Sequence, residues 1–289
     1  MQPITKAILP VAGFGTRFLP ITKAQPKEML PIVDKPIIQY LVEEAVNSGI
    51  KEIIFVTGRG KRSIEDHFDD SFELEYNLVE KNKHELLKEI YKIPRLAKFS
   101  YVRQPNPMGD GHAIACGRHL AGNKPCAVLF GDDIVDSEIP CLKQLIAVYE
   151  KYGDPVLALE KVPKSEVLRY GVVSGIEVGP KTYQIKTLVE KPKPEEALSN
   201  LTIVGKYIIT SAIFDALEKC APGKDGEIRL ADAFKAVLAE NKPIYGLEFE
   251  GKRYDCGSKI GLLKANIDFA LKHKDLNGEF REYLKGLKL

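Results

Sequence analysis

Cysteine is scarce in this sequence of 289 residues, and its pattern excludes two kinds of scaffold. The five cysteines are an odd number, and no two of them stand in a C-x-x-C spacing. A disulfide framework needs paired cysteines, and a zinc site needs closely spaced ligands. We therefore expect buried or idle thiols in a reducing compartment (Cys116, Cys126, Cys141, Cys220 and Cys256).

Long apolar runs and an excess of one charge are also missing. No stretch reaches the ~18 apolar residues that a membrane span requires, and residues 1–6 do not fit a signal peptide. We therefore expect a cytoplasmic protein without a membrane partner. The formal net charge of +2 gives no bulk field that would favour nucleic acid. An anionic ligand would have to be held by individually placed cations.

Two known phosphate-binding fingerprints are absent. Gly13-Phe14-Gly15 follows a short apolar run, and a lone Gly-x-Gly of this kind is often a plain turn. The dinucleotide fingerprint G-x-G-x-x-G would need glycine where Phe18 stands. The G-K-[ST] end of a P-loop is missing as well. These absences argue against a dinucleotide-dependent dehydrogenase and against a P-loop protein.

The same segment nevertheless carries cations in a stiffened loop. Glycines allow backbone N–H groups to approach a triphosphate closely because no side chain is in the way. The guanidinium of Arg17 could donate two hydrogen bonds to phosphate oxygens, and the ammonium of Lys27 would add a point charge. Pro20, Pro26 and Pro31 stiffen the chain around them. The alternative is a proline-rich surface loop whose basic residues are solvated.

Strand-like and helix-like segments alternate along the chain. Continuous apolar runs are typical of strands that are covered on both faces of a parallel sheet, and apolar pairs at helical spacing indicate amphipathic helices. Ligands of such a fold bind at the carboxyl ends of the strands. Turn-linked strands in the middle predict a mixed or antiparallel subregion. The expected strands are 6–12, 52–57, 125–130, 156–159, 170–178, 183–190 and 202–210, and the expected helices are 36–48, 80–92, 140–152, 228–240 and 258–273.

Residues 10–23 (PVAGFGTRFLPITK) and 26–32 (PKEMLPI) closely resemble the signature of the sugar-1-phosphate nucleotidyltransferases, in particular of bacterial UTP–glucose-1-phosphate uridylyltransferases. Further motifs extend the resemblance to about residue 257. The resemblance implies a Rossmann-like α/β fold of the glycosyltransferase-A type, with a mostly parallel sheet flanked by helices. It implies a single domain over 1–289, with 1–135 mainly binding nucleotide, 136–260 mainly binding sugar and 261–289 forming a helical tail.

The activity that the resemblance implies is transfer of a uridylyl group from UTP to α-D-glucose 1-phosphate, giving UDP-glucose and pyrophosphate. The implied cofactor is Mg²⁺, and a homodimer or homotetramer is expected. Because the attacking sugar phosphate is already anionic, direct in-line displacement needs no general base, which agrees with the lack of a Ser/His/Asp or Cys/His pattern. Relatives that use dTTP share these motifs, but the segment from Phe18 to Pro31 and the run 254–257 (YDCG) are closer to the uridylyl branch.

The resemblance also assigns nucleotide contacts. An amide side chain suits uracil, whose edge offers both a donor and an acceptor, and Gln104 would serve this purpose. Asp110 departs from the usual leucine of the family, and we expect no catalytic role for His112. The implied nucleotide-binding residues are Ala12, Gly13, Gly15, Thr16, Arg17, Glu28, Gln104, Gly109 and Asp133.

Metal and sugar contacts follow in the second half. Adjacent side chains on a strand point to opposite sides, so one carboxylate of the pair Asp132-Asp133 should face the site. The resemblance makes Asp132 and Asp255 the ligands of Mg²⁺, which accepts few carboxylates together with phosphate oxygens and water. Arg229 stands where the family usually has glutamine. The implied catalytic residues are Arg17, Lys27, Asp132 and Lys191, and the implied sugar-binding residues are Gly171, Glu190, Lys191 and Val204.

Overall fold

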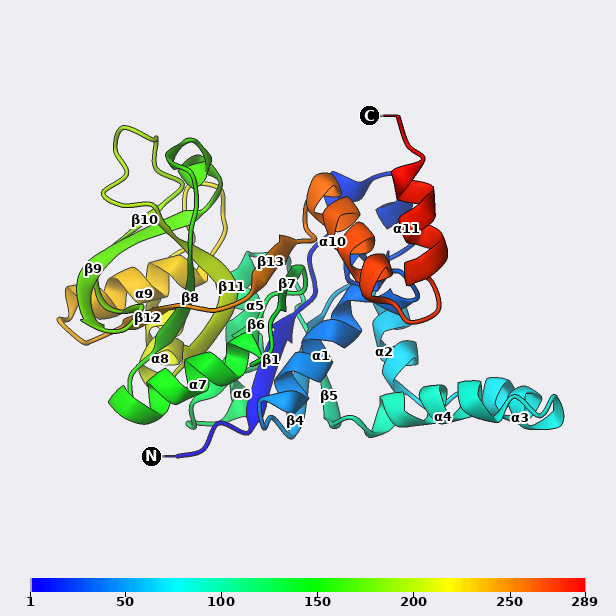
Figure 1. The fold of residues 1–289 in the computed structure, drawn as a ribbon. Helices are drawn as coiled ribbons and strands as arrows, with labels where there is room; N and C mark the ends of the chain where they lie inside the picture. Colours follow the sequence, from blue (N-terminus) through cyan, green and yellow to red (C-terminus); the bar gives the residue numbers. More distant parts are fainter. Residues whose placement is uncertain (1, 289) are drawn as a thin grey trace.

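Nine strands form one mixed sheet at the centre of the molecule, which a computed structural model describes from residue 2 to residue 288 (Figure 1). Their order across the sheet is β5-β4-β1-β6-β11-β8-β12-β10-β9. The strands are β1 (Lys6–Pro10), β4 (Glu52–Thr57), β5 (Lys98–Arg103), β6 (Cys126–Leu129), β8 (Val156–Lys161), β9 (Gly171–Gly179), β10 (Thr182–Glu190), β11 (Leu201–Ile209) and β12 (Tyr245–Glu248).

The expectation of a mostly parallel sheet is wrong. The four strands β5, β4, β1 and β6 are parallel to one another, but β11 enters antiparallel to both β6 and β8. β9 and β10 are joined by a short turn around Lys181, and two strands joined so tightly can only run antiparallel. The parallel half therefore covers the segment that resembles a nucleotide-binding region, and the mixed half covers the rest.

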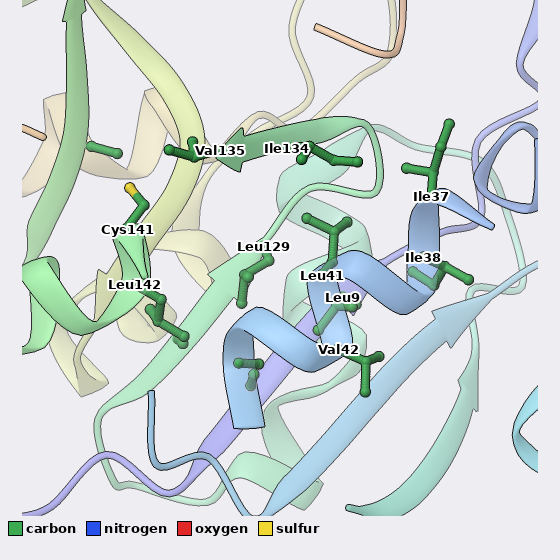
Figure 2. Close-up of a cluster of buried hydrophobic side chains, with 14 of the residues drawn as sticks. Leu9, Ile37, Ile38, Leu41, Val42, Leu129, Ile134, Val135, Cys141 and Leu142 are labelled. Atoms are coloured by element: carbon green, nitrogen blue, oxygen red, sulfur yellow. The ribbon is translucent and has the colours of Figure 1, made fainter. Parts of the chain in front are cut away.

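Helices cover both faces of the sheet because alternate strand residues point to opposite sides. Leu9 and Leu129 join one core with the apolar faces of α1 and α7, which Figure 2 shows. Ile8 and Val128 join a second core with α5, α8 and α9. The helices are α1 (Ile37–Asn47), α2 (Arg62–Phe68), α3 (Phe72–Glu80), α4 (His84–Lys92), α5 (Asp110–Cys116), α6 (Arg118–Ala121), α7 (Cys141–Tyr152), α8 (Ser211–Lys219), α9 (Leu230–Ala239), α10 (Lys259–Lys272) and α11 (Asn277–Lys285).

Short elements complete the fold. β7 pairs with β13 in an antiparallel ribbon outside the main sheet, and β2 pairs with β3. The strands are β2 (Pro31–Ile32), β3 (Lys35–Pro36), β7 (Asp133–Asp136) and β13 (Lys252–Asp255), and the 3₁₀ turns are η1 (Thr16–Phe18), η2 (Ile21–Lys23), η3 (Lys27–Met29), η4 (Ile93–Arg95) and η5 (Lys164–Arg169). No helix within residues 2–288 is both long and apolar enough to span a bilayer.

The helix expected at 80–92 corresponds to α4, and α3, which precedes it at 72–80, was not expected. α3 and α4 meet at a turn where Asn82 adopts a positive φ of 52°. Figure 1 shows this pair projecting away from the sheet. The pair, which we call the α3–α4 arm (residues 72–92), exposes apolar side chains at Phe72, Leu74, Tyr76, Val79, Leu86 and Tyr91.

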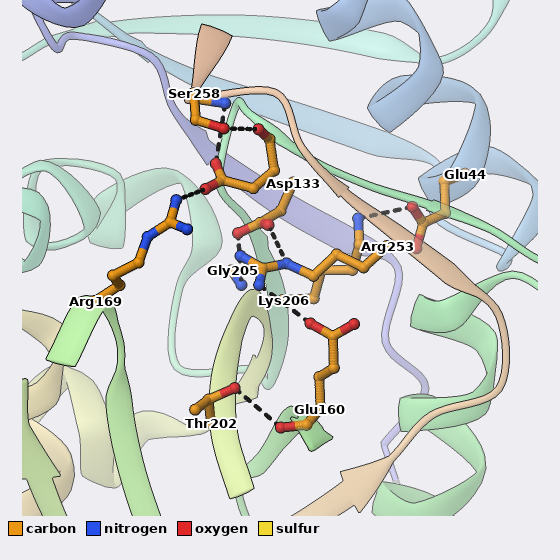
Figure 3. A network of polar contacts seen from close by, with 11 residues as sticks. Glu44, Asp133, Glu160, Arg169, Thr202, Gly205, Lys206, Arg253 and Ser258 are labelled. Atoms are coloured by element: carbon orange, nitrogen blue, oxygen red, sulfur yellow. Dashed lines mark hydrogen bonds and ion pairs between the residues drawn. The ribbon is translucent and has the colours of Figure 1, made fainter. Parts of the chain in front are cut away.

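A buried ion pair ties the parallel half to the mixed half. Lys206 of β11 is fully buried, and its Nζ lies 2.7 Å from Glu44 Oε2 on α1 (Figure 3). The other oxygen of Glu44 accepts a hydrogen bond from Leu142 N, at 3.0 Å, in the first turn of α7. Because a buried charge is stabilised only by its partners, the two charges depend on each other.

We expect Glu44→Ala to lower the free energy of unfolding by about 3–5 kcal/mol, because it leaves the ammonium of Lys206 buried and unpaired. Urea unfolding measures the loss. Glu43→Ala is the matched control on the same helix, since Glu43 pairs with Lys35 near the surface and should contribute under ~1 kcal/mol. Equal losses in the two variants would contradict this account of the buried pair.

Candidate functional site

Two cavities adjoin where β1 and β6 end, at the carboxyl edge of the parallel strands. The loop cavity, of about 520 Å³, lies over the segment that follows β1, and the strand cavity, of about 570 Å³, lies over β9, β10 and β11. Both are lined by four shared residues, Arg17, Asp110, Phe130 and Asp132. A ligand that fills both cavities would therefore contact these four side chains.

The structure brings nearly all predicted site residues to these cavities. Val204 is the exception, because its side chain is buried in the core on the other face of β11 while Ile203 and Gly205 line the strand cavity. Only the main chain of Val204 could therefore reach a ligand. The loop cavity is lined by Ala12, Gly13, Gly15, Thr16, Arg17, Lys27, Glu28, Gln104 and Gly109, and the strand cavity by Asp133, Gly171, Glu190, Lys191 and Asp255.

The glycine loop is shaped by a left-handed residue. Gly15 has a φ of 66°, and a Cβ there would also crowd Lys27 Cβ at 3.1 Å. Thr22 Oγ1 donates a hydrogen bond to Gly15 O at 2.8 Å and fixes the turn. Arg17 follows on η1 and donates to Gly257 O at 3.4 Å. The loop therefore holds an exposed guanidinium over the place where the two cavities meet.

Lys27 and Asp132 form the central ion pair of the site, with Lys27 Nζ 2.6 Å from Asp132 Oδ2. Burial opposes the charge of Lys27, but Asp132 and Glu28 together outweigh it and raise the pKa of the lysine. Burial likewise opposes the charge of Asp132, yet Lys27 and Arg17 outweigh it and lower the pKa of the carboxyl. Both groups are therefore charged at neutral pH.

Beneath them lies a second pair that the sequence did not suggest. Glu28 is fully buried, and its Oε2 lies 2.7 Å from Lys61 Nζ, while its Oε1 has no hydrogen-bond partner among the described residues. Burial raises the pKa of Glu28, and burial lowers the pKa of Lys61. Gly131 leaves room for Glu28, because a Cβ there would lie 2.8 Å from Glu28 Cγ.

Both carboxylate oxygens of Asp133 are engaged by other residues of the protein. One oxygen accepts a hydrogen bond from Gly205 N at 2.9 Å, and the other lies 2.6 Å from Nε of Arg253 (Figure 3). Arg253 also reaches Glu160 Oε2 at 3.2 Å and lies over the ring of Tyr170. Burial would lower the pKa of Arg253, but Asp133 raises it instead. Asp133, which the resemblance made a nucleotide contact, lines the strand cavity and not the loop cavity, and the protein engages both of its carboxylate oxygens.

Asp132 and Asp255 meet at Gly257. A side chain at Gly257 would collide with Asp132 Oδ2 and approach Asp255 Oδ1 at 3.1 Å. Cys256 N donates to Asp132 O at 2.8 Å, which joins the two segments. No group of three or more His, Cys, Asp or Glu side chains within residues 2–288 could hold a metal alone. Two carboxylates beside a cavity fit a hard cation such as Mg²⁺, which takes further ligands from phosphate and water.

Gln104 is held in place by the start of α5. Its Nε2 donates to Gly109 O at 3.0 Å and lies 3.0 Å from Nδ1 of His112. His112, for which we expected no catalytic role, thus orients the amide. Since the nitrogen of Gln104 is engaged by the protein, the carbonyl oxygen is the group that could accept from a ligand in the loop cavity.

The two departures from the family pattern lie side by side. Asp110 Oδ1 accepts a hydrogen bond from Leu230 N at 2.8 Å, at the first residue of α9. Arg229, the residue before it, forms ion pairs with Asp225 and with Glu227, the latter at 3.0 Å. Met108 O accepts from Ile228 N at 2.8 Å, so the two loops are joined along their backbones.

On the opposite wall, Glu190 and Lys191 end β10. Lys191 is exposed, and its Nζ lies 3.6 Å from Glu190 Oε1. Its φ of 47° is unusual for a residue with a side chain, and its N–H donates to Tyr170 O at 3.1 Å. Gly171 leaves space here, because a Cβ would approach Glu190 Oε2 at 3.0 Å.

Lys27→Met should lower stability in a pH-dependent way. With Lys27 present, the pKa of Asp132 lies below its unfolded value, so its stabilisation is present above the unfolded pKa and lost only as the pH falls through the folded pKa. Without Lys27, burial dominates and raises that pKa, so the carboxylate destabilises the fold at neutral pH and this penalty is relieved on acidification.

We therefore expect the deficit in unfolding free energy of Lys27→Met, relative to the natural protein, to be smaller at about pH 4.5 than at about pH 7. Chemical unfolding at both values measures it. Lys35→Met, which breaks a half-exposed pair with Glu43, should show a deficit under ~1 kcal/mol at either pH. A Lys27→Met deficit that is equal at both values would contradict the electrostatic account.

Comparison with known proteins places these features in a family. A model of the family described as nucleotidyl transferase matches residues 6–271. The UTP--glucose-1-phosphate uridylyltransferase of Bacillus subtilis (strain 168) is 50% identical to this chain over 287 residues, 99% of this chain and 98% of the relative. A relative of the same name from Staphylococcus haemolyticus is also 50% identical, over 99% of each chain.

Solved structures agree. A UTP-bound UGPase from Acinetobacter baumannii superposes with a TM-score of 0.91 at 40% identity, over 99% of this chain and 100% of that chain. A UDP-glucose pyrophosphorylase complexed with UDP-glucose gives a TM-score of 0.86 at 46% identity, over 94% of this chain and 100% of that chain. The family expected from the glycine loop is thereby confirmed.

Proposed function

Because this chain belongs to the nucleotidyl transferase family, we propose that it joins UTP to α-D-glucose 1-phosphate, giving UDP-glucose and pyrophosphate. The names of relatives at 50% identity over nearly the whole chain support this activity. The observation that carries it is the junction of the loop cavity and the strand cavity at Arg17 and Asp132. A nucleotide in one cavity and a sugar phosphate in the other would bring their phosphates together there.

We assign the loop cavity, whose lining comes from residues 1–135 apart from Glu227, to the nucleotide. Uracil carries one ring N–H donor between two carbonyl acceptors, and Gln104 offers its carbonyl oxygen to such a donor. Glu28, whose Oε1 has no partner among the described residues, is a second acceptor in the wall of this cavity. Its neighbour in sequence, Lys27, and Arg17 would meet the phosphates. Ala12, Gly13, Gly15, Thr16 and Gly109 would contact the nucleotide through the backbone.

We assign the strand cavity, whose lining comes mostly from residues 136–260, to the sugar. Glu190 would accept hydrogen bonds from glucose hydroxyls, and the exposed Lys191 would hold the sugar phosphate. Gly171 leaves the space for the pyranose, and Val204 would contribute only its main chain. Direct in-line displacement needs no general base, since the attacking phosphate is anionic at neutral pH. The residues then act by position and charge.

Mg²⁺ is the cofactor that this site fits best. Asp132 and Asp255 would hold it, because both flank Gly257 and both line the strand cavity. When bound, it supplies positive charge that neutralises and aligns phosphate oxygens. Lys27 already neutralises Asp132 Oδ2, so the ion and the lysine would share this carboxylate. Asp255 also has a cationic neighbour, because a guanidinium nitrogen of Arg169 lies 3.5 Å from Asp255 Oδ2.

We also propose a homodimer or homotetramer in the cytoplasm. The α3–α4 arm exposes apolar side chains on one projecting element, and such patches are typical of protein contacts. All five cysteines are free, which suits a reducing compartment.

The activity is tested by mixing purified protein with UTP, glucose 1-phosphate and Mg²⁺. We expect pyrophosphate and UDP-glucose in equal amounts, and much lower turnover when dTTP replaces UTP. Lys191→Ala should raise KM for glucose 1-phosphate more than KM for UTP, by roughly tenfold to a hundredfold, because one charged contact to the sugar phosphate is lost. No product from UTP, or better turnover with dTTP, would contradict the proposal.

A further inference from the structure

Asp110 is the one acidic residue of the two cavities that lacks a basic partner among the described residues. The acids around it are all paired: Asp132 with Lys27, Asp133 with Arg253, Asp255 with Arg169, Glu190 with Lys191, Glu28 with Lys61 and Glu227 with Arg229. Arg229 stands close to Asp110 in the chain fold, but its guanidinium is taken by Asp225 and Glu227.

The carboxylate of Asp110 is nonetheless fixed in orientation. Its Oδ1 accepts from Leu230 N at 2.8 Å, where α9 presents N–H groups without partners inside the helix. A carboxylate has capacity for about four hydrogen bonds, so most of this capacity is left for a ligand. Burial raises the pKa of Asp110, while the N–H groups of Leu230 and Gly111 oppose this shift. Asp110 and Glu190 both line the strand cavity.

We propose that Asp110 is a specificity-determining residue whose carboxylate accepts a hydrogen bond from a hydroxyl group of the hexose, on the side of the sugar away from Glu190. The inference rests on the proposed function. The side of the sugar follows from where the two acids lie. Both line the strand cavity, but only Asp110 also lines the loop cavity, so Asp110 lies on the side of the sugar that faces the nucleotide. Asp110 is half-buried in the cavity wall, and an acceptor without a cation in such a place is satisfied by a neutral donor such as a pyranose hydroxyl.

The consequence is selection by hydroxyl pattern. A hexose that lacks the contacted hydroxyl leaves the carboxylate unpaired, and sites built in this way reject such analogues strongly. In the natural protein, one member of the series of 2-, 3-, 4- and 6-deoxyglucose 1-phosphates should therefore lose roughly tenfold to a hundredfold in kcat/KM through Asp110.

The test compares this series in the natural protein, in Asp110→Leu and in Asp110→Asn, with Asp215→Asn as control. In Asp110→Leu the penalty for that one deoxy sugar should shrink to about threefold or less, while the other penalties stay unchanged. Asp110→Asn keeps the oxygen that accepts from Leu230 N but replaces the other carboxylate oxygen with an NH₂ group. It should therefore reduce the same penalty even if the leucine variant does not fold. Asp215→Asn removes an acid that pairs with Arg118, and because neither residue lines either cavity it should leave every penalty unchanged.

Penalties that are the same in all four proteins would overturn the inference. So would a reduced penalty for 2′-deoxy-UTP in place of a deoxy sugar, because the contact would then belong to the ribose. If the natural protein makes no UDP-glucose from glucose 1-phosphate and UTP, the proposed function fails. If it makes UDP-glucose and the penalties do not respond to Asp110, only the inference fails.

Discussion

The pairing of β7 with β13 is the constraint on which the candidate site depends. It joins two segments about 120 residues apart in the chain, in a register that sets Asp133 opposite Asp255. The hydrogen bond from Cys256 N to Asp132 O extends the pairing by one step and brings both carboxylates to Gly257. Arg17 also reaches Gly257 O, so the glycine loop is anchored to the same point.

Charge compensation organises the space around this ribbon. Buried charges are costly unless they are paired, and most charged side chains of the site form ion pairs with one another. Lys27 and Asp132 hold each other charged, and below them Lys61 faces Glu28. Three cations that line the two cavities are exposed: Arg17, Arg169 and Lys191. An anionic ligand would therefore meet exposed cations above ion pairs that already compensate one another, with Asp110 as the one unpaired acid of the two cavities among the described residues.

Local patterns predicted buried strands and amphipathic helices. The apolar run at 52–57 coincides with β4, and the helix expected at 140–152 is α7, which starts one residue later. β7 and β13 were missed because each has four residues, DIVD and KRYD, whose pairing is entirely non-local. The direction of β11 depends on tertiary packing, so the sheet was wrongly expected to be mostly parallel. The resemblance located the carboxylates, but their partners Lys61 and Arg253 belong to no pattern that the sequence shows.

We propose that Asp132 and Asp255 bind the same metal ion. A double-mutant cycle on turnover, measured across a Mg²⁺ titration with melting temperatures as control, tests it most directly. If the ion is shared, Asp132→Asn and Asp255→Asn should each reduce kcat greatly and demand more Mg²⁺, and the double variant should lose far less than the two losses combined, because residues that act as a unit are not additive. Additive losses in kcat with an unchanged Mg²⁺ requirement would contradict a shared site.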